Sequence, residues 1–72
     1  MIMYGQRLRI ARKNCKLTLE QVADHLNTTH ATISRYENEV NKVDPYTLTE
    51  LCKLYKVSAD YILGLPYDLE HP

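Results

Sequence analysis

The stretch that most constrains the fold is residues 18–38, TLEQVADHLNTTHATISRYEN. Apolar residues recur in its first half at i, i+3, i+4 and i+7: Leu19, Val22, Ala23 and Leu26. This spacing predicts a helix of about two turns with one apolar face. Thr18 precedes the helix and Gln21 stands three residues later, which together make a T-x-x-Q capping box. Asn27 follows the last apolar residue and tolerates the left-handed conformation in which many helices end.

The second half of the stretch predicts another helix, capped by Thr29 and running through Asn38. At about 100° per residue, Ile33, Tyr36 and Glu37 fall on its inner side. The outer side is small, polar and nearly uncharged: Ala31, Thr32, Ser34, Arg35 and Asn38. Short side chains with a few hydrogen-bonding tips suit a surface that presses against another molecule. Two helices joined by a tight turn, the second with such a face, form a helix-turn-helix arrangement.

Three further helices are predicted around this pair. An apolar face predicts a helix over about residues 3–14: Tyr4, Leu8, Ala11 and Cys15. Asp44-Pro45 is a strong start signal for a fourth helix, whose inner face is Leu48, Leu51, Cys52 and Tyr55. Ser58 caps a fifth, with Tyr61 and Ile62 facing inward, and Gly64 ends it. No strand-like alternation is present, so the fold class is all-α: a compact five-helix bundle.

Length and composition set outer limits on organisation and location. The 72 residues make one domain over 1–66 and a short tail over 67–72. No apolar run approaches the roughly 18 residues of a membrane span, and no signal peptide is recognised, so we expect a cytoplasmic protein with no membrane partner. Cys15 and Cys52 form no CxxC and no disulfide framework, so we expect free thiols on inner helical faces.

Charge is distributed unevenly along a chain whose net charge is zero. Residues 1–19 hold five basic residues and no acid, and residues 20–72 hold four basic and nine acidic residues. Around the outward helix, only Arg35 and Lys42 are free of a neighbouring acid in sequence. Each phosphate contact contributes about 0.9 to the salt slope of binding to duplex DNA. We therefore expect weak binding to non-specific DNA.

Several segments carry a resemblance that covers roughly residues 3–64. They are RLRIAR (7–12), LTLEQVADHL (17–26), THATISRYEN (29–38), DPYTLTELCKLYKVS (44–58) and DYILG (60–64). They resemble the Cro and repressor helix-turn-helix family of temperate phages, also called the xenobiotic-response-element type. The resemblance implies a lambda-repressor-like DNA-binding domain, acting in a bacterial host cell, whose third helix enters the major groove of double-stranded operator DNA.

The resemblance also implies roles for individual residues. Base-facing positions are matched by His30, Ala31, Thr32 and Arg35. Phosphate-contacting positions are matched by Thr18, Thr29, Asn38 and Lys42. Arg12 and Glu37 match a partly buried ion pair that joins helix one to helix three. Three positions where the family often has Gly are occupied here by Lys16, Asn27 and Glu39, and Leu19 replaces a common phosphate-gripping Gln.

Two functions follow, and the sequence leaves both open. The first is a transcriptional regulator in a phage-type genetic switch, usually dimeric on half-sites about one helical turn apart. The second is a protein-binding module that engages a helix-turn-helix repressor through helices two and three. The size and neutral charge are similar to those of the modulator-of-repression antirepressors of lactococcal temperate phages. Ile10, Leu65 and Leu69 could seed a homodimer contact, although single exposed apolar residues are ordinary.

Other chemistries are poorly supported by the residues present. His25 and His30 do not have helical i, i+4 spacing and no third ligand is placed near them, so no metal site is predicted. Neither cysteine lies on an exposed nucleophilic turn, and there is no paired-carboxylate constellation. With only two glycines, the chain has no phosphate-cradling loop. We expect neither catalysis nor a cofactor.

Overall fold

The computed structural model describes residues 4–64, which fold into five helices. They are α1 (Tyr4–Asn14), α2 (Leu19–His25), α3 (His30–Glu37), α4 (Pro45–Tyr55) and α5 (Ala59–Leu63). No strand occurs in this part of the chain, so the all-α prediction is confirmed. None of these helices is long and apolar enough to cross a bilayer. Leu65, Tyr67 and Leu69 lie outside the described residues.

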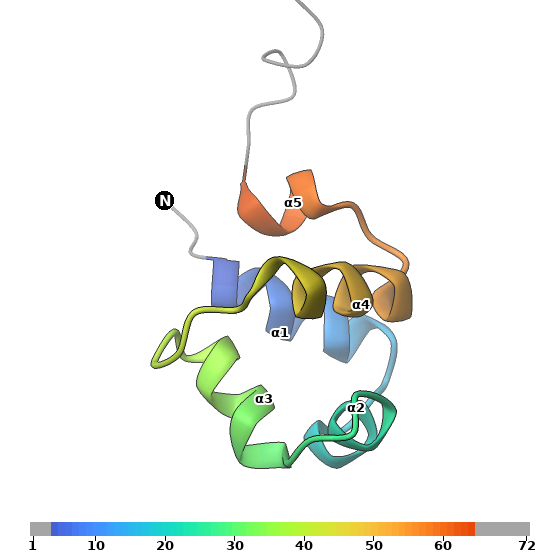
Figure 1. Cartoon of the computed structure of the whole chain (residues 1–72). Helices are drawn as coiled ribbons and strands as arrows, with labels where there is room; N and C mark the ends of the chain where they lie inside the picture. The colour runs from blue at the N-terminus through green and yellow to red at the C-terminus, as the bar shows by residue number, and fades with distance from the viewer. Residues whose placement is uncertain (1–3, 65–72) are drawn as a thin grey trace, which may run out of the picture.

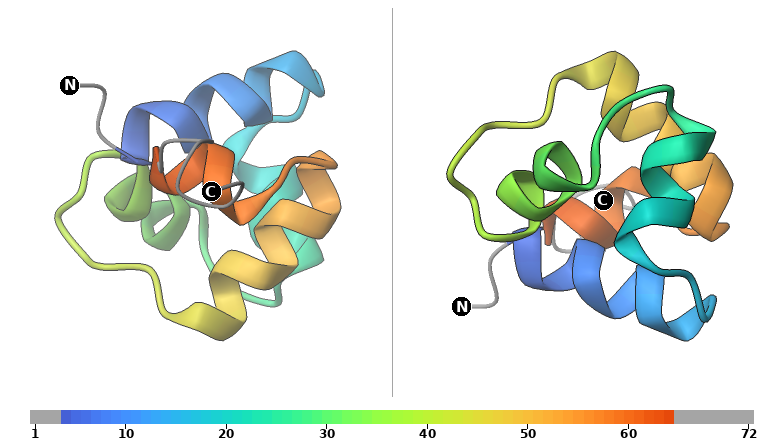
Figure 2. Two further views of the ribbon diagram at one scale, coloured as in Figure 1. Left: turned by 90° about the horizontal axis from the view of Figure 1, so that it is seen from above. Right: turned by 90° about the horizontal axis from the view of Figure 1, so that it is seen from below.

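The helices stack in three tiers (Figure 1). The α5 helix lies at one end, α1 and α4 form the middle, and α2 and α3 lie at the other end. Seen along the stack, α5 lies between α1 and α4 (Figure 2), and it packs against both. The α3 helix packs against α2 and α1. Two helices, α1 and α2, therefore cover one side of α3. The opposite side of α3 is not covered by α5, which lies at the other end of the stack.

The predicted helix starts are confirmed by capping hydrogen bonds. Four side chains accept a backbone N–H from the first turn of the following helix: Thr18, Thr29, Asp44 and Ser58. At α2 the capping box is complete, since Gln21 N donates to Thr18 Oγ1 (3.1 Å) and Thr18 N donates to Gln21 Oε1 (2.8 Å). Each such cap stabilises a helix start by about 1 kcal/mol.

Four turns contain a non-glycine residue in the left-handed conformation: Lys16, Asn27, Glu39 and Lys56, with φ of 57–59°. Three of these are the positions at which the family resemblance implies a frequent Gly. The conformation costs roughly 1–2 kcal/mol per residue, less for Asn. Gly64, which ends α5 at φ 70°, adopts it without that cost.

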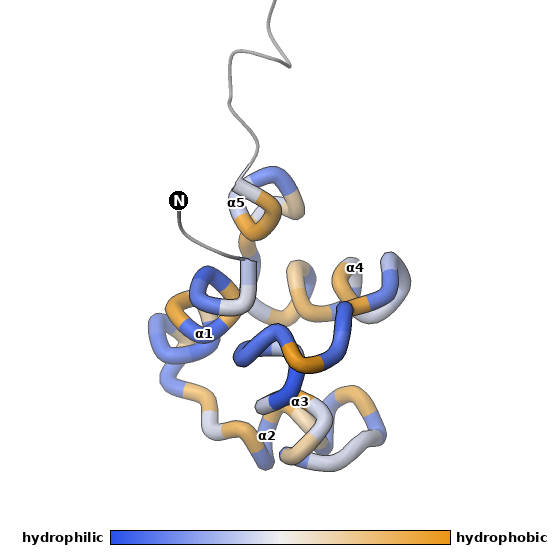
Figure 3. The backbone as a smooth tube through the Cα atoms, turned by 90° about the vertical axis from the view of Figure 1, so that its left-hand side faces the viewer, coloured by the Kyte–Doolittle hydropathy of each residue, from blue (hydrophilic) through white to orange (hydrophobic). Residues whose placement is uncertain are grey.

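A single apolar core joins the helices. Its most buried members are Leu8, Val22, Ile33, Leu51 and Ile62. Cys52 and Tyr55 are also buried, so the predicted inner faces of α3, α4 and α5 are confirmed for these residues. Each helix contains both hydrophobic and hydrophilic residues (Figure 3), as expected when one side of a helix is buried and the other faces solvent.

Two predicted inner residues are exposed instead. Cys15 lies one residue beyond α1, in the turn before Lys16, and there its side chain faces solvent while Sγ stays 3.6 Å from the Tyr55 carbonyl oxygen. Tyr61 is 37% exposed because α5 is so short that Ile62 alone fills its inward position. The Tyr61 ring packs instead against Arg7, whose guanidinium carbon lies 5.3 Å from the ring centre, a cation–π contact.

Gly5 sets how closely α1 approaches α3. A Cβ atom at this position would overlap the backbone carbonyl group of Glu37 at the end of α3 and crowd the Glu39 side chain. The first turn of α1 therefore rests directly on the last turn of α3. This requirement was not recognised from the sequence, because an isolated Gly in a helical pattern carries no information about its partner.

We predict that Gly5→Ala destabilises the domain. The added methyl group would clash with the backbone carbonyl of Glu37, which cannot move aside as a flexible side chain could. Such overpacking costs about 1–3 kcal/mol, and we expect this cost to exceed the roughly 1 kcal/mol that Ala gains over Gly inside a helix. Thermal unfolding followed by circular dichroism should show a lower Tm. Gln6→Ala is the control, since the neighbouring Gln6 is exposed; a Gly5→Ala variant as stable as that control would contradict the close approach.

We also predict a loss of stability at alkaline pH that depends on Tyr55. Burial raises the pKa of Tyr55, and the charge of Glu37 adds to the increase. The folded state holds the phenol proton more tightly than the unfolded chain, whose tyrosine pKa is about 10. This contribution is complete below about pH 10 and is lost progressively above it. Urea midpoints measured across this range should fall more steeply for wild type and the exposed-site control Tyr46→Phe than for Tyr55→Phe; parallel curves would contradict the prediction.

Candidate functional site

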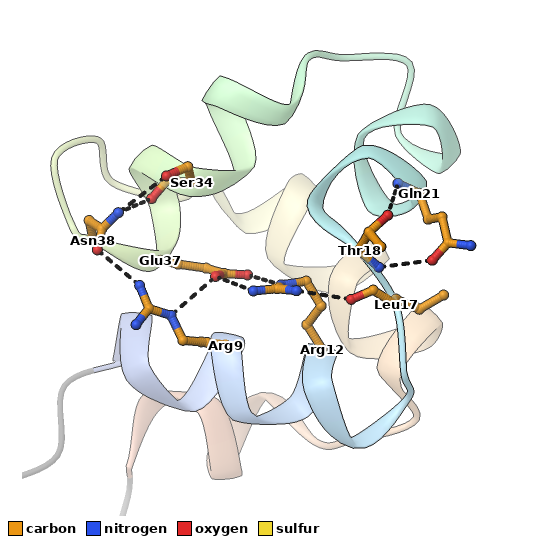
Figure 4. Close-up of polar contacts among 8 residues, drawn as sticks. All are labelled: Arg9, Arg12, Leu17, Thr18, Gln21, Ser34, Glu37 and Asn38. Carbon is orange, nitrogen blue, oxygen red and sulfur yellow. Dashed lines mark hydrogen bonds and ion pairs between the residues drawn. The ribbon is translucent and has the colours of Figure 1, made fainter.

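The site is organised by an ion pair between Arg12 of α1 and Glu37 of α3 (Figure 4). Arg12 Nε donates to Glu37 Oε2 at 2.7 Å and Nη2 donates to Oε1 at 3.1 Å. The side chains are 11% and 3% exposed. The hydrogen bonds to Glu37 raise the pKa of Arg12, against the opposing effect of burial. Arg12 Nη1 also donates to the Leu17 carbonyl oxygen (2.9 Å), so one guanidinium ties α1, α3 and the start of α2 together.

A second arginine extends this network to the surface. Arg9 Nε lies 3.5 Å from Glu37 Oε1, and Arg9 Nη2 donates to Asn38 Oδ1 at 3.1 Å. Asn38 Nδ2 in turn donates to the Ser34 carbonyl oxygen (3.0 Å) and Oγ (3.2 Å). Figure 4 shows this run of contacts along the facing sides of α1 and α3. Arg9 was not recognised as a site residue, although its i, i+3 spacing from Arg12 places the two on one helical face.

The outward face of α3 differs in exposure from one residue to the next. The exposed members are Thr29, His30, Arg35 and Asn38. The half-buried members are Ala31, Thr32 and Ser34. Thr29 Oγ1 accepts from Thr32 N (3.3 Å) and lies 3.1 Å from Thr32 Oγ1, so these two hydroxyls are already in contact. Arg35 makes no ion pair with any residue of the described range, and its guanidinium is free to meet a ligand.

The two remaining phosphate-contact candidates lie at the edges of this face. Thr18 is exposed at the start of α2, with its hydroxyl engaged in the capping box. Lys42 is exposed in the connection between α3 and α4. There it borders a hollow of about 250 Å³ that is otherwise lined mainly by apolar side chains: Tyr4, Val43, Leu48 and Leu63.

The carboxylate of Glu39, the residue after the phosphate-contact candidate Asn38, faces α1. In the structure, Glu39 Oε2 accepts from the backbone N–H of Gly5 at 3.2 Å. That N–H belongs to the first turn of α1, which is the positive end of the helix dipole. The Glu39 carboxylate therefore caps the start of α1, and the residue is half-buried rather than fully presented to a ligand.

Metal binding has no structural support within residues 4–64. No three His, Cys, Asp or Glu side chains there come together as metal ligands. His25 ends α2 and His30 begins α3, and both are exposed.

Comparison with known proteins gives one family and several relatives. The family described as "Helix-turn-helix" matches residues 8–62. The chain is 47% identical over 66 residues to the "Uncharacterized HTH-type transcriptional regulator YobD" of Bacillus subtilis (strain 168), covering 92% of this chain and 59% of that protein. It is 40% identical over 60 residues to the "HTH-type transcriptional regulator ImmR" of the same organism, covering 83% and 47%. The chain thus spans about half the length of the curated relatives it matches.

We predict that Glu37→Ala unfolds the domain or lowers its Tm sharply. The substitution leaves the Arg12 guanidinium buried without its carboxylate, which costs roughly 3–5 kcal/mol and is much of the margin of a small domain. Glu50→Ala is the matched control, because its 3.5 Å pair with Lys53 is exposed on the lysine side and such pairs contribute at most about 1 kcal/mol. Equal melting curves for the two variants would show that the buried pair does not stabilise the fold.

Proposed function

The chain belongs to the helix-turn-helix family, and on that premise we propose that it regulates transcription by binding double-stranded operator DNA through α3. It acts as a regulator and not as an enzyme. The observation that carries the proposal is the outward face of α3: exposed Arg35, with no ion-pair partner among the described residues, beside short polar side chains. Its relatives described as transcriptional regulators support the same function.

In the proposed complex, α3 lies in the major groove and its side chains meet base edges. Arg35 has the fork geometry that pairs with O6 and N7 of guanine. The methyl groups of Ala31 and Thr32 suit contact with the methyl group of thymine. His30, in the first turn, reaches a base edge or a phosphate. Phosphate contacts fall to the polar residues around this face: Thr18, Thr29, Asn38 and Lys42.

The sparse positive charge of the site predicts a small salt dependence. If Arg35 reads a base, Lys42 is the cation left for phosphate contact near α3. With one or two phosphates neutralised per protomer, the logarithmic salt slope should be only about −1 to −2 for each half-site. Most of the free energy of binding would then come from base contacts rather than from counterion release.

The cellular setting is part of the proposal. We place the protein in the cytoplasm of a bacterial host cell, in a phage-type genetic switch. A homodimer would set two α3 helices on half-sites about 34–36 Å apart. Ile10, which is exposed on α1, is the dimer-contact candidate inside the described residues.

A second function is favoured by the surface next to α3. Val40, in the connection from α3 to α4, is 70% exposed, and Tyr46, in the first turn of α4, is 73% exposed. Protein interfaces draw on such apolar and aromatic contacts, whereas DNA interfaces are strongly positive. The alternative is therefore an antirepressor, a switch partner that grips a helix-turn-helix repressor with the α2 and α3 surface and alters its DNA binding.

One titration separates the two functions. Duplex DNA from the promoter region of the gene is titrated with the protein alone, and with the neighbouring repressor present, at two salt concentrations. Sequence-dependent binding by the protein alone supports the regulator. Absence of binding by the protein alone, with loss of repressor binding when the protein is added, supports the antirepressor.

We predict that Arg35→Ala weakens binding to the preferred duplex by about tenfold to a hundredfold, the discrimination expected of one bidentate contact to guanine. Fluorescence anisotropy with labelled duplexes measures the effect. Lys53→Ala is the matched control, since it removes one positive charge from the exposed surface of α4. Wild-type affinity in Arg35→Ala would remove α3 from the mechanism.

A further inference from the structure

We propose that Arg9 is a positioning residue that keeps the hydroxyl proton of Ser34 available to DNA, by holding the Asn38 amide in the orientation in which it donates to Ser34. The inference rests on the proposed function of α3 and adds a residue of α1 to the determinants of sequence preference. It is carried by three consecutive contacts that run from the core to the outward face of α3.

The first contact fixes the direction of Arg9. Its side chain is 47% exposed, yet Nε lies 3.5 Å from Glu37 Oε1. Glu37 is itself held by two hydrogen bonds from buried Arg12. Because the carboxylate cannot move, the Arg9 guanidinium is aimed at the end of α3, where Nη2 meets Asn38 Oδ1 at 3.1 Å.

The second contact orients the amide of Asn38. A guanidinium offers only donors, so the Asn38 atom facing Arg9 must be the carbonyl oxygen. The NH₂ group then lies on the opposite side, towards the preceding turn of α3. There it donates to the Ser34 carbonyl oxygen at 3.0 Å and to Ser34 Oγ at 3.2 Å.

The third contact leaves the hydroxyl proton of Ser34 free. Ser34 Oγ accepts from Asn38, and no residue between 4 and 64 accepts the Ser34 proton in return. The usual helical alternative is seen at Thr49 of α4, whose hydroxyl donates to the Pro45 carbonyl oxygen four residues earlier (2.8 Å). Ser34 is half-buried on the outward face, so its proton is available to a ligand there.

The consequence is that an acceptor on a base edge can be bound by Ser34. A hydroxyl whose proton is free can donate to an acceptor in the major groove, such as N7 of a purine, O6 of guanine or O4 of thymine. If the Asn38 amide were reversed, its carbonyl oxygen would face Ser34 Oγ and take that proton, and Ser34 would present lone pairs alone. Arg35, a neighbour in sequence, offers donors only. With the proton of Ser34 free, this part of α3 therefore suits acceptor-rich steps.

The contacts are tested first in the free protein by NMR. In Arg9→Met, the Asn38 carbonyl oxygen loses its hydrogen bond from a charged group, and the amide is no longer held against Ser34. The Asn38 side-chain amide protons should then exchange with water about tenfold faster than in wild type, in line with the free energy of one such bond. Arg9→Lys keeps a donor and should restore part of the protection. Lys13→Met is the matched control, because Lys13 is exposed on the same helix. Unchanged exchange in Arg9→Met would overturn the proposal.

The second test selects binding sites from a randomised duplex library. Arg9→Met and Lys13→Met each remove one positive charge, so both should lose general affinity to a similar extent. Only Arg9→Met and Ser34→Ala should select fewer sites with an acceptor base at the step that Ser34 faces. Selection of such sites by Arg9→Met as often as by Lys13→Met would overturn the proposal. If wild type binds no duplex, the proposed function fails together with the DNA role of Ser34, and the exchange rates alone decide whether Arg9 orients Asn38.

Discussion

The buried pair of Arg12 and Glu37 is the contact on which the remaining structure depends. It fixes the angle between α1 and α3, and through the Leu17 carbonyl oxygen it fixes the start of α2 as well. A buried pair of this kind contributes little net stability relative to apolar residues of the same volume, but loss of one partner is severe. Its value here is orientation: α3 cannot rotate about its axis without breaking both hydrogen bonds. The outward face of α3 thus keeps one register.

That orientation is maintained in a domain with a small margin of stability. A chain of this length buries only about 60% of its unfolded surface, and four of its turns place non-glycine residues in the left-handed conformation. Side-chain caps at four helix starts and the direct contact of Gly5 with the end of α3 offset part of this cost. Glu39 illustrates the balance, since the residue that bears backbone strain also provides the carboxylate that caps α1.

The sequence predicted the helices and most of the core, because caps and apolar spacing are local signals. Thr18, Asp44 and Ser58 begin helices as expected, and Ile33 and Ile62 are buried. Side chains near helix ends were harder to predict. Cys15 continues the periodic pattern of α1 beyond the point where the helix stops, and Tyr61 lies on a helix of barely more than one turn. The Arg9–Asn38–Ser34 contacts were not found, because the sequence does not show where two helices approach.

The same contacts explain why a basic N-terminal segment coexists with a neutral, sparsely charged site. Of the five basic residues in positions 1–19, Arg12 is buried, Arg9 is bound to Glu37 and Asn38, and Arg7 lies over the Tyr61 ring. These three charges are engaged by contacts within the fold, although the Arg9 side chain stays 47% exposed. Lys13 and Lys16 are the exposed cations of this segment for which no ion pair is seen within residues 4–64. General attraction to phosphate is therefore weak, and selectivity must come from the donors and methyl groups that α3 presents. A surface of this kind depends on correct orientation more than on charge, which is what the buried pair provides.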